Sequence, residues 1–462
     1  MRKALAVAGL NVGFGLIGLI GLIGPSAANA AWDYNQPFSL KTHTPAFGQA
    51  PVFLPDGRVT FGQDFKQGQK NQVYVENFDG SGQQCLTCTD VPDPGNGNVS
   101  GSDPNNVNGV PAVRPQGDWI IFHSWRGHGM VIGSPGYGGM GSSLWAMHPD
   151  GSDQTRLTET NQSNFSGEGY DDYHAYWSPD GTHLEYAHLN WNFVTGGGSG
   201  KWDVRVAKFN VGADGKPYLS GDHEVRPFNG HWYETQWWNP NARTPGFLYT
   251  ESYPEQGSGG GASVPQLFYC ALPSMDSGQC RVTRITDHAS WDEQAIFTPD
   301  GRKILFMSSR DRDGIFNTWA NLTRSAGVPA DLDYLLILPI FEAGFLQPVG
   351  QEATDLYMTS LRDPHAVTRL TTDGNDGWIT PEFGWDPSRQ CLVWTENRFP
   401  DGYRYQLPQG PTGWLAQLQY LGANPPDPNK IVDVNQNGVG VAPLPVQQRT
   451  RIGSFARSTC KL

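Results

Sequence analysis

The sequence predicts an all-β protein in which a four-stranded unit repeats six times around a ring. Three observations lead to this prediction. A turn signal built on proline, usually Pro-Asp-Gly, recurs at intervals of roughly 60 residues, with one longer interval before the last copy. Runs of apolar and β-branched residues flank each turn. Glycine and proline are abundant, at 57 and 35 of 462 residues, which suits one large domain with many turns.

The clearest copy of the unit lies at residues 288–310, where an apolar strand precedes the turn and another follows it. Pro299 presets φ for the turn, Asp300 can bond its own backbone, and Gly301 accepts a left-handed conformation. The other five turns are centred on Pro55, Pro115, Pro179, Pro240 and Pro387. The copies at Pro55 and Pro179 keep the Asp-Gly pair, whereas the remaining three lack it.

Each unit continues with a third strand and often a fourth. Residues 143–147 are followed by 154–158, and residues 355–359 by 367–371. Four antiparallel strands per repeat, arranged radially, make a six-bladed β-propeller. We expect residues 38–43 to form a strand that completes the last blade.

The repeat pattern F-S/T-P-D-G-x-x-I-x-F, followed by L-Y-x-M and then x-R-L-T, closely resembles the TolB-like (PD40, or WD40-like) propeller repeats. The resemblance covers roughly residues 45–425. It implies the propeller fold. It does not imply one activity, because propellers are scaffolds that host unrelated functions.

The first 30 residues read as a secretory signal peptide, with a charged start at Arg2 and Lys3, an apolar run, and a cleavage site after Ala30. The alternative is an uncleaved membrane anchor. No later segment reaches spanning length. The expected domains are the signal at 1–30, the propeller at 31–425, and a C-terminal extension at 426–462 packed on the propeller.

Six cysteines agree with a secreted or periplasmic protein. The favoured pairing joins sequence neighbours, Cys85 with Cys88 and Cys270 with Cys280, and leaves Cys391 with Cys460. Six cysteines allow fifteen connectivities.

The formal net charge is −13 and the pI is near 5.2. Such a chain lacks the basic stripe that neutralises phosphates, so nucleic acid is disfavoured as a partner. We expect an extracellular ligand or protein partner, and a monomer.

Gly-rich insertions fall at the same connection in several repeats, so they should gather on one face of the ring, where function usually resides. The longest insertion is 311–352 in blade five, with an apolar run at 335–341. It reads either as a buried lid or as a surface for a partner or ligand.

The first strand of each blade should line the central channel. In four blades, the residue five or six positions before the turn proline is ionisable. These four residues should lie at the same level of the central channel. Blades one and two offer Ala50 and Val110 instead. The candidate site residues are His174, Glu234, Glu293 and Glu382.

Three readings of this cluster stay open. A histidine with several carboxylates could hold a divalent metal, Ca²⁺ or Mn²⁺. Crowded carboxylates with raised pKa could act as general acid and base. They could also be ordinary residues of the channel mouth. The resemblance adds that some secreted propellers with a metal at this place are polysaccharide lyases, but no motif of theirs is matched closely here.

Further ligand contacts are expected around the channel mouth. Arg126 and His128 begin an inserted loop and could meet an anionic ligand, whereas Trp and Tyr side chains suit flat sugar rings. The full set of expected ligand-binding residues is Arg126, His128, Trp232, Trp291 and Arg310. His183 and His188 stand an odd number of residues apart on one strand, so they should face opposite ways in structural roles.

Near the C-terminus, Asp433, Asn435 and Asn437 match the first half of a calcium loop. The twelfth position is Leu444, which cannot bind the ion. An ordinary Asn-Gly turn and a Ca²⁺ site completed from elsewhere both remain open.

Two function hypotheses follow. The first is a secreted or periplasmic propeller that binds a glycan, protein or small molecule at the channel mouth. The second is an enzyme at the same place, a metal-assisted polysaccharide lyase or hydrolase.

Overall fold

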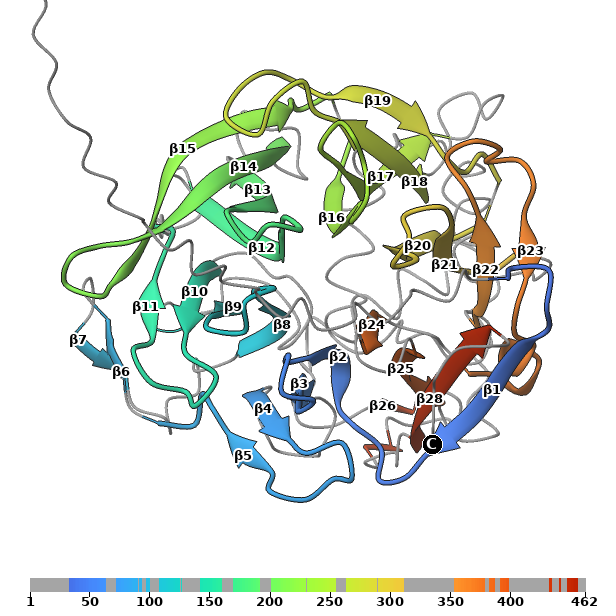
Figure 1. Ribbon diagram of the computed structural model, residues 1–462, viewed down its shortest axis with the longest axis horizontal. Helices are drawn as coiled ribbons and strands as arrows, with labels where there is room; N and C mark the ends of the chain where they lie inside the picture. The colour runs from blue at the N-terminus through green and yellow to red at the C-terminus, as the bar shows by residue number, and fades with distance from the viewer. Residues whose placement is uncertain are drawn as a thin grey trace, which may run out of the picture.

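The protein is a six-bladed β-propeller in the computed structural model (Figure 1). The structure describes residues 33–63, 72–89, 91–93, 97–99, 108–124, 126, 142–159, 169–191, 201–229, 231–254, 263–288, 290–310, 353–378, 382–386, 391–398, 432–433, 440–441 and 447–455. The signal peptide, the 311–352 insertion and His128 lie outside these residues.

Six four-stranded antiparallel sheets stand radially around the centre, as the repeats predicted. Blade one contains β2 (Gln49–Phe53), β3 (Val59–Gln63), β4 (Gln72–Glu76) and β5 (Gln84–Cys85). Blade two contains β8 (Asn108–Val113), β9 (Ile120–Ser124), β10 (Ser143–Met147) and β11 (Thr155–Arg156). Blade three contains β12 (Gly169–Trp177), β13 (His183–Trp191), β14 (Lys201–Val211) and β15 (Pro217–Arg226).

The remaining blades follow the same order from the channel outwards. Blade four contains β16 (Tyr233–Trp238), β17 (Gly246–Pro254), β18 (Ser263–Ala271) and β19 (Arg281–Arg284). Blade five contains β20 (Asp292–Phe297), β21 (Ile304–Ser308), β22 (Asp355–Thr359) and β23 (Thr368–Arg369). Blade six contains β24 (Phe383–Asp386), β25 (Cys391–Arg398), β28 (Gln447–Phe455) and β1 (Phe38–His43).

The other described elements are small. They are the strand pairs β6 (Val91–Asp93) with β7 (Gly97–Val99) and β26 (Val432–Asp433) with β27 (Gly440–Val441), and a 3₁₀ turn, η1 (Asp373–Asp376). No helix within the described part of the chain is long and apolar enough to cross a bilayer.

Blade six joins the two ends of the chain. The strand β1 pairs with β28 along its whole length, from Phe38 opposite Phe455 to His43 opposite Thr450. This confirms the expected use of residues 38–43. The strand β28 belongs to the segment expected as a C-terminal extension, and it is the third strand of the sheet.

The turns form as the sequence predicts. In blade five, the Gly301 amide donates to the Thr298 carbonyl at 2.7 Å, and the Asp300 side chain accepts from the Arg302 amide at 3.1 Å. Gly301 has φ of 67°, which an L side chain adopts only with strain.

A cluster of buried apolar side chains fills each boundary between neighbouring blades. The last of these clusters packs Phe47 and Phe61 of blade one against Val393 and Ile452 of blade six, which closes the ring. Burial of each such side chain contributes roughly 1.5–3 kcal/mol. The hydrophobic effect therefore holds the blades at fixed spacing around the channel.

Two disulfides join sequence neighbours as expected, Cys85 with Cys88 and Cys270 with Cys280. Cys391 is also disulfide-bonded. Cys460 lies outside the described residues.

Replacement of Gly384 by alanine should destabilise the ring at the boundary between blades six and one. A Cβ at Gly384 would lie 2.0 Å from the Pro51 carbonyl oxygen, which is backbone and cannot move aside. We expect a loss of about 1–3 kcal/mol in the free energy of unfolding, measured by urea denaturation. Gly215→Ala is the control, because its Cβ meets no atom within 4 Å and it tests only the cost of positive φ. A loss for Gly384→Ala of less than about 1 kcal/mol would contradict the steric argument.

Candidate functional site

The inner strands carry a β-bulge at the same place in five blades. The pairing register shifts between Gln49 and Val52, Gly109 and Ala112, Tyr173 and Tyr176, Thr235 and Trp238, and Glu293 and Ala295. In four of these blades a residue other than glycine adopts positive φ, between 43° and 50°: Ala50, Val110, His174 and Gln294. Bulges bend a strand and re-aim its side chains. These four residues stand five positions before their turn prolines.

Three of the sequence-predicted residues meet at this level. His174 Nδ1 lies 2.9 Å from Glu234 Oε1 of blade four, and His174 Nε2 lies 3.9 Å from Glu382 Oε1 of blade six. The three side chains are between 7% and 13% exposed. Blades three and six face each other across the ring (Figure 1). The contact of His174 with Glu382 therefore crosses the channel, whereas its contact with Glu234 joins the adjacent blades three and four.

Two glutamines that the sequence reasoning missed hold Glu234 in place. Gln294 Nε2 and Gln236 Nε2 donate to Glu234 Oε1 at 2.9 and 3.1 Å. The side-chain oxygen Oε1 of Gln236 in turn accepts from the Ala295 backbone amide at 3.2 Å. The glutamines thus tie blade four to blade five.

Glu293 and its neighbour Gln294 both contribute to the site. A step of five residues before Pro299 identifies Gln294, which lies in the left-handed region and contacts Glu234. Glu293 stands one residue earlier, and its Oε2 accepts from Trp291 Nε1 at 2.6 Å. It nevertheless belongs to the cluster, because its charge interacts with those of Glu234, His174 and Glu382.

Burial is the main influence on the pKa values of the ionisable groups in this cluster. Desolvation raises the pKa of Glu234 to about 8, against the hydrogen bonds from Gln294 and Gln236 that lower it. Desolvation also raises the pKa of Glu293, and the charge of Glu234 raises it further. Burial lowers the pKa of His174, against the charges of Glu382 and Glu293. Burial therefore favours the neutral forms of both His174 and Glu234.

A second imidazole lies beside this pair. The His123 ring, on β9, is nearly parallel to the His174 ring, with centroids 6.1 Å apart and planes 7° apart. His123 is only 1% exposed. Burial and the proximity of His174 both lower its pKa. The neutral imidazole rings of His123 and His174 are thus stacked on the side of the polar cluster that faces blade two.

The donor geometry does not fit the expected Ca²⁺ or Mn²⁺ site. An ion needs several ligand atoms converging on one point. Here Glu234 approaches one ring nitrogen of His174 and Glu382 the other, so the two carboxylates lie on opposite sides of the ring. No set of three His, Cys, Asp or Glu side chains among the described residues is arranged to hold a metal. No step below depends on a metal.

Arg126 has partners inside the protein. Its guanidinium donates to Gln154 Oε1 and, at 3.0 Å, to the Thr87 carbonyl oxygen, and it lies over the Trp145 ring at 5.4 Å. The residue is 1% exposed, and burial lowers its pKa to about 9. These contacts join blades one and two.

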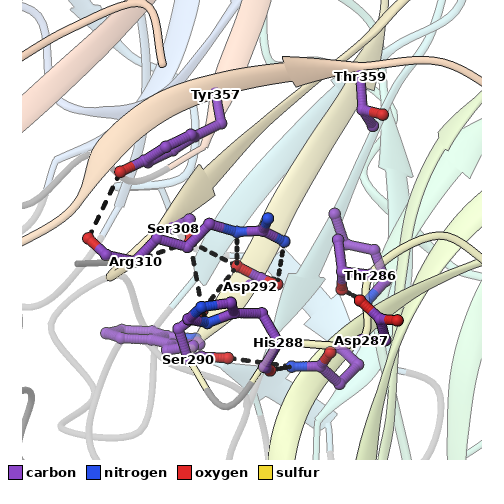
Figure 2. Close-up of polar contacts among 12 residues, drawn as sticks. Thr286, Asp287, His288, Ser290, Asp292, Ser308, Arg310, Tyr357 and Thr359 are labelled. Atoms are coloured by element: carbon purple, nitrogen blue, oxygen red, sulfur yellow. Dashed lines mark hydrogen bonds and ion pairs between the residues drawn. The ribbon is translucent and has the colours of Figure 1, made fainter. Parts of the chain in front are cut away.

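Arg310 is also engaged (Figure 2). It forms an ion pair with the buried carboxylate of Asp292 at 2.9 Å, and Ser308 donates to the same carboxylate at 2.5 Å. Its guanidinium lies 5.3 Å above the centroid of the Phe306 ring. The Arg310 guanidinium fixes the start of the inner strand of blade five.

The two tryptophans lie at the start of inner strands. Trp232 is half-buried against the apolar cluster of blades three and four, with its ring 6.4 Å from that of Trp202. Trp291 is half-buried and bonds Glu293. Asp433 is part of β26. Asn435 and Asn437 lie outside the described residues, so the calcium-loop prediction stays a prediction.

Comparison with solved structures finds other propellers at low sequence identity. A putative TolB from Agrobacterium tumefaciens is 15% identical over 72% of this chain and 87% of its own, with a TM-score of 0.40. An oligogalacturonate lyase in complex with manganese is 9% identical over 92% of this chain and 98% of its own, with a TM-score of 0.41. A puromycin-hydrolysing peptidase from Mycobacterium tuberculosis is 12% identical over 80% of this chain, with a TM-score of 0.40.

This chain spans 44% of the peptidase's length. No protein-family profile matches the sequence, and no curated protein matches it. Identities this low speak to the fold alone. The function therefore has to be argued from the site.

Replacement of Glu234 by glutamine should flatten the pH dependence of stability. A carboxyl group with raised pKa keeps, in the folded state, a proton that the unfolded chain has already lost. The free energy of unfolding thus falls as pH rises from 4.5, the ordinary pKa, to about 8, by up to about 1.4 kcal/mol per pH unit.

Glutamine retains the acceptor oxygen for Gln236 and Gln294 but has no proton to lose. We therefore expect the stability of Glu234→Gln relative to the native protein to increase steadily from pH 5 to pH 8 in urea denaturation. Parallel pH profiles for the two proteins would show that Glu234 does not titrate in this window. Glu224→Gln, at an exposed position on β15, is the matched control.

Proposed function

We propose that this propeller binds an uncharged, hydroxyl-rich extracellular ligand, a glycan, at the mouth of its central channel. The observation that carries the proposal is the convergence of three buried polar side chains from different blades: His174 Nδ1 lies 2.9 Å from Glu234 and His174 Nε2 lies 3.9 Å from Glu382, while Nδ1 makes no hydrogen bond with any described residue. A ligand bound there meets groups from blades three, four and six at once.

The protonation of the cluster favours hydroxyl groups over ions. A protonated carboxyl group and a neutral imidazole each offer one donor and at least one acceptor. Sugar hydroxyl groups need the same combination. A phosphate or sulfate would instead meet unfavourable charge, because the chain carries a formal charge of −13.

The composition of the bulge positions supports a ligand with two unlike faces. Ala50 and Val110 occupy these positions in blades one and two, whereas His174 and Gln294 occupy them in blades three and five. A pyranose ring presents C–H groups on its faces and hydroxyl groups at its edge, which matches a site that is apolar on one side and polar on the other.

The signal-like first 30 residues and the disulfides support an extracellular or periplasmic setting for this binding. We propose that the protein acts there as a monomer.

The second candidate is acid–base catalysis on a polysaccharide, by elimination or hydrolysis. Near neutral pH, Glu234 holds a proton and His174 has lost one, because burial moves their pKa values in opposite directions. An acid and a base with such protonation states in contact are what proton transfer to a leaving group and from a carbon or water requires.

Binding is tested by isothermal titration calorimetry of the purified protein with neutral hexasaccharides of glucose, xylose and mannose, and with polygalacturonate. We expect one of the neutral hexasaccharides to bind, and Glu234→Ala to weaken that binding by about 10-fold, the equivalent of one or two lost hydrogen bonds. The variant Glu234→Gln keeps the acceptor oxygen at position 234, so it distinguishes a loss of binding from a loss of folding. Glu224→Ala should leave the affinity unchanged. Absence of binding by all three neutral hexasaccharides would overturn the proposal.

The enzymatic candidate is tested on the same saccharides through the release of new reducing ends and of unsaturated products. We expect His174→Gln and Glu234→Gln each to lower any turnover by about 100-fold. If the native protein binds a saccharide tightly but releases no product from it, the result supports the binding function over the enzymatic one.

A further inference from the structure

A second histidine–carboxylate pair lies on blade three beside the channel cluster. Asp172 is two residues before His174 on β12, and His188 is its cross-strand partner on β13. His188 Nδ1 and Asp172 Oδ1 are 2.7 Å apart. Two residues of an extended strand span roughly 7 Å. The pair therefore stands one step along the inner strand from the cluster, towards the end of the sheet where β13 continues to β14.

Asp172 fixes the orientation of the imidazole. Its side chain is 4% exposed, whereas that of His188 is 15% exposed. A carboxylate that accepts from Nδ1–H holds the ring in one tautomer and leaves Nε2 as the acceptor. Among the described residues, none makes a hydrogen bond or ion pair with His188 Nε2.

His183, on the same strand, shows the contrast. Its Nδ1 contacts Thr182 Oγ1 at 2.8 Å and its Nε2 contacts Asp276 Oδ1 at 3.2 Å, so both nitrogens have partners within the protein. The sequence reasoning gave both histidines structural roles. The contacts account fully for His183 in that role, but they use only one nitrogen of His188.

The groups around His188 are ionisable and come from three strands. Asp203 is its cross-strand partner on β14, and the Asp203 side chain is 12% exposed. Arg205 lies 3.7 Å from Asp203 but pairs more closely with Asp222, at 2.9 Å. Asp203 Oδ1 makes no hydrogen bond with any described residue.

Tyr170 covers one face of the imidazole. Its ring centroid is 5.6 Å from that of His188, with the planes 23° apart. With the Tyr170 ring on one face and Asp172 at Nδ1, the His188 side chain is still 15% exposed.

We propose that His188, oriented by Asp172, is the accessible hydrogen-bond acceptor of this site, and that its Nε2 accepts a hydrogen bond from a hydroxyl group of the ligand bound over the His174–Glu234 pair. This inference rests on the proposed function, because it assigns a role towards the same ligand.

The electrostatics of the pair agree with this role. Burial by itself lowers the pKa of His188, but the hydrogen bond and charge of Asp172 and the charge of Asp203 raise it above its usual value. Burial raises the pKa of Asp203 to about 7. A raised pKa makes the His188 imidazole more basic and therefore a stronger hydrogen-bond acceptor at Nε2.

The assignment is tested with diethyl pyrocarbonate, which acylates neutral, accessible imidazole nitrogens, followed by mass-spectrometric mapping of each histidine. We expect His188 to react much faster than the buried His123 and His174, with His365, whose side chain is 76% exposed, as the internal reference. The rate at His188 should increase with pH through its raised pKa. In Asp172→Asn the midpoint should fall by about one pH unit or more, because the opposite charge is gone. Reaction no faster than at His174, or an unchanged midpoint in Asp172→Asn, would overturn the assignment.

The link to the ligand is tested by repeating the reaction with the saturating neutral hexasaccharide found by calorimetry. We expect the His188 rate to fall at least 10-fold while the His365 rate is unchanged. If the hexasaccharide binds and His188 reacts as fast as before, the inference fails while the proposed function stands. If no hexasaccharide binds, the proposed function fails and the role of His188 towards a ligand fails with it, whatever its intrinsic reactivity.

Discussion

The antiparallel pairing of β1 with β28 is the contact on which the other features of the ring depend. A radial array of sheets has two open ends until the first and last strands meet in one sheet. Once they meet, six apolar boundaries hold the inner strands at fixed spacing. The contact of His174 with Glu382 joins opposite blades, so it exists only in the closed ring.

Bulges in the inner strands place side chains from several blades together at the channel. A non-glycine residue at positive φ costs roughly 1–2 kcal/mol, and four blades carry one at the same level. Because the positive φ recurs at the same position in four blades, it is a property of the repeat. In blades three and five the bulged residue takes part in the polar network, through His174 and Gln294. The strain is therefore located where side chains from several blades meet.

The sequence predicted the ring and part of the site for a physical reason. The turn prolines and glycines act locally, so their spacing identifies the blades and counts back to His174, Glu234 and Glu382. The count of five or six residues before Pro299 spans both Gln294 and Glu293, and the prediction named only Glu293. The roles of Gln236 and Gln294 depend on which neighbouring blade they face, which no local pattern encodes. Arg126 and Arg310 were both expected to contact a ligand, and their carbonyl, amide and carboxylate partners within the protein are visible only in the folded chain.

The shared sixth sheet has a consequence for how the protein is made. Residues 38–43 emerge early during synthesis and residues 447–455 emerge about 400 positions later, so contacts of this range form slowly. Until then β25 and β1 each present an unpaired edge, and unpaired edges recruit other chains into aggregates. A nascent chain of this protein therefore passes through a long interval in which its open strand edges need protection by chaperones.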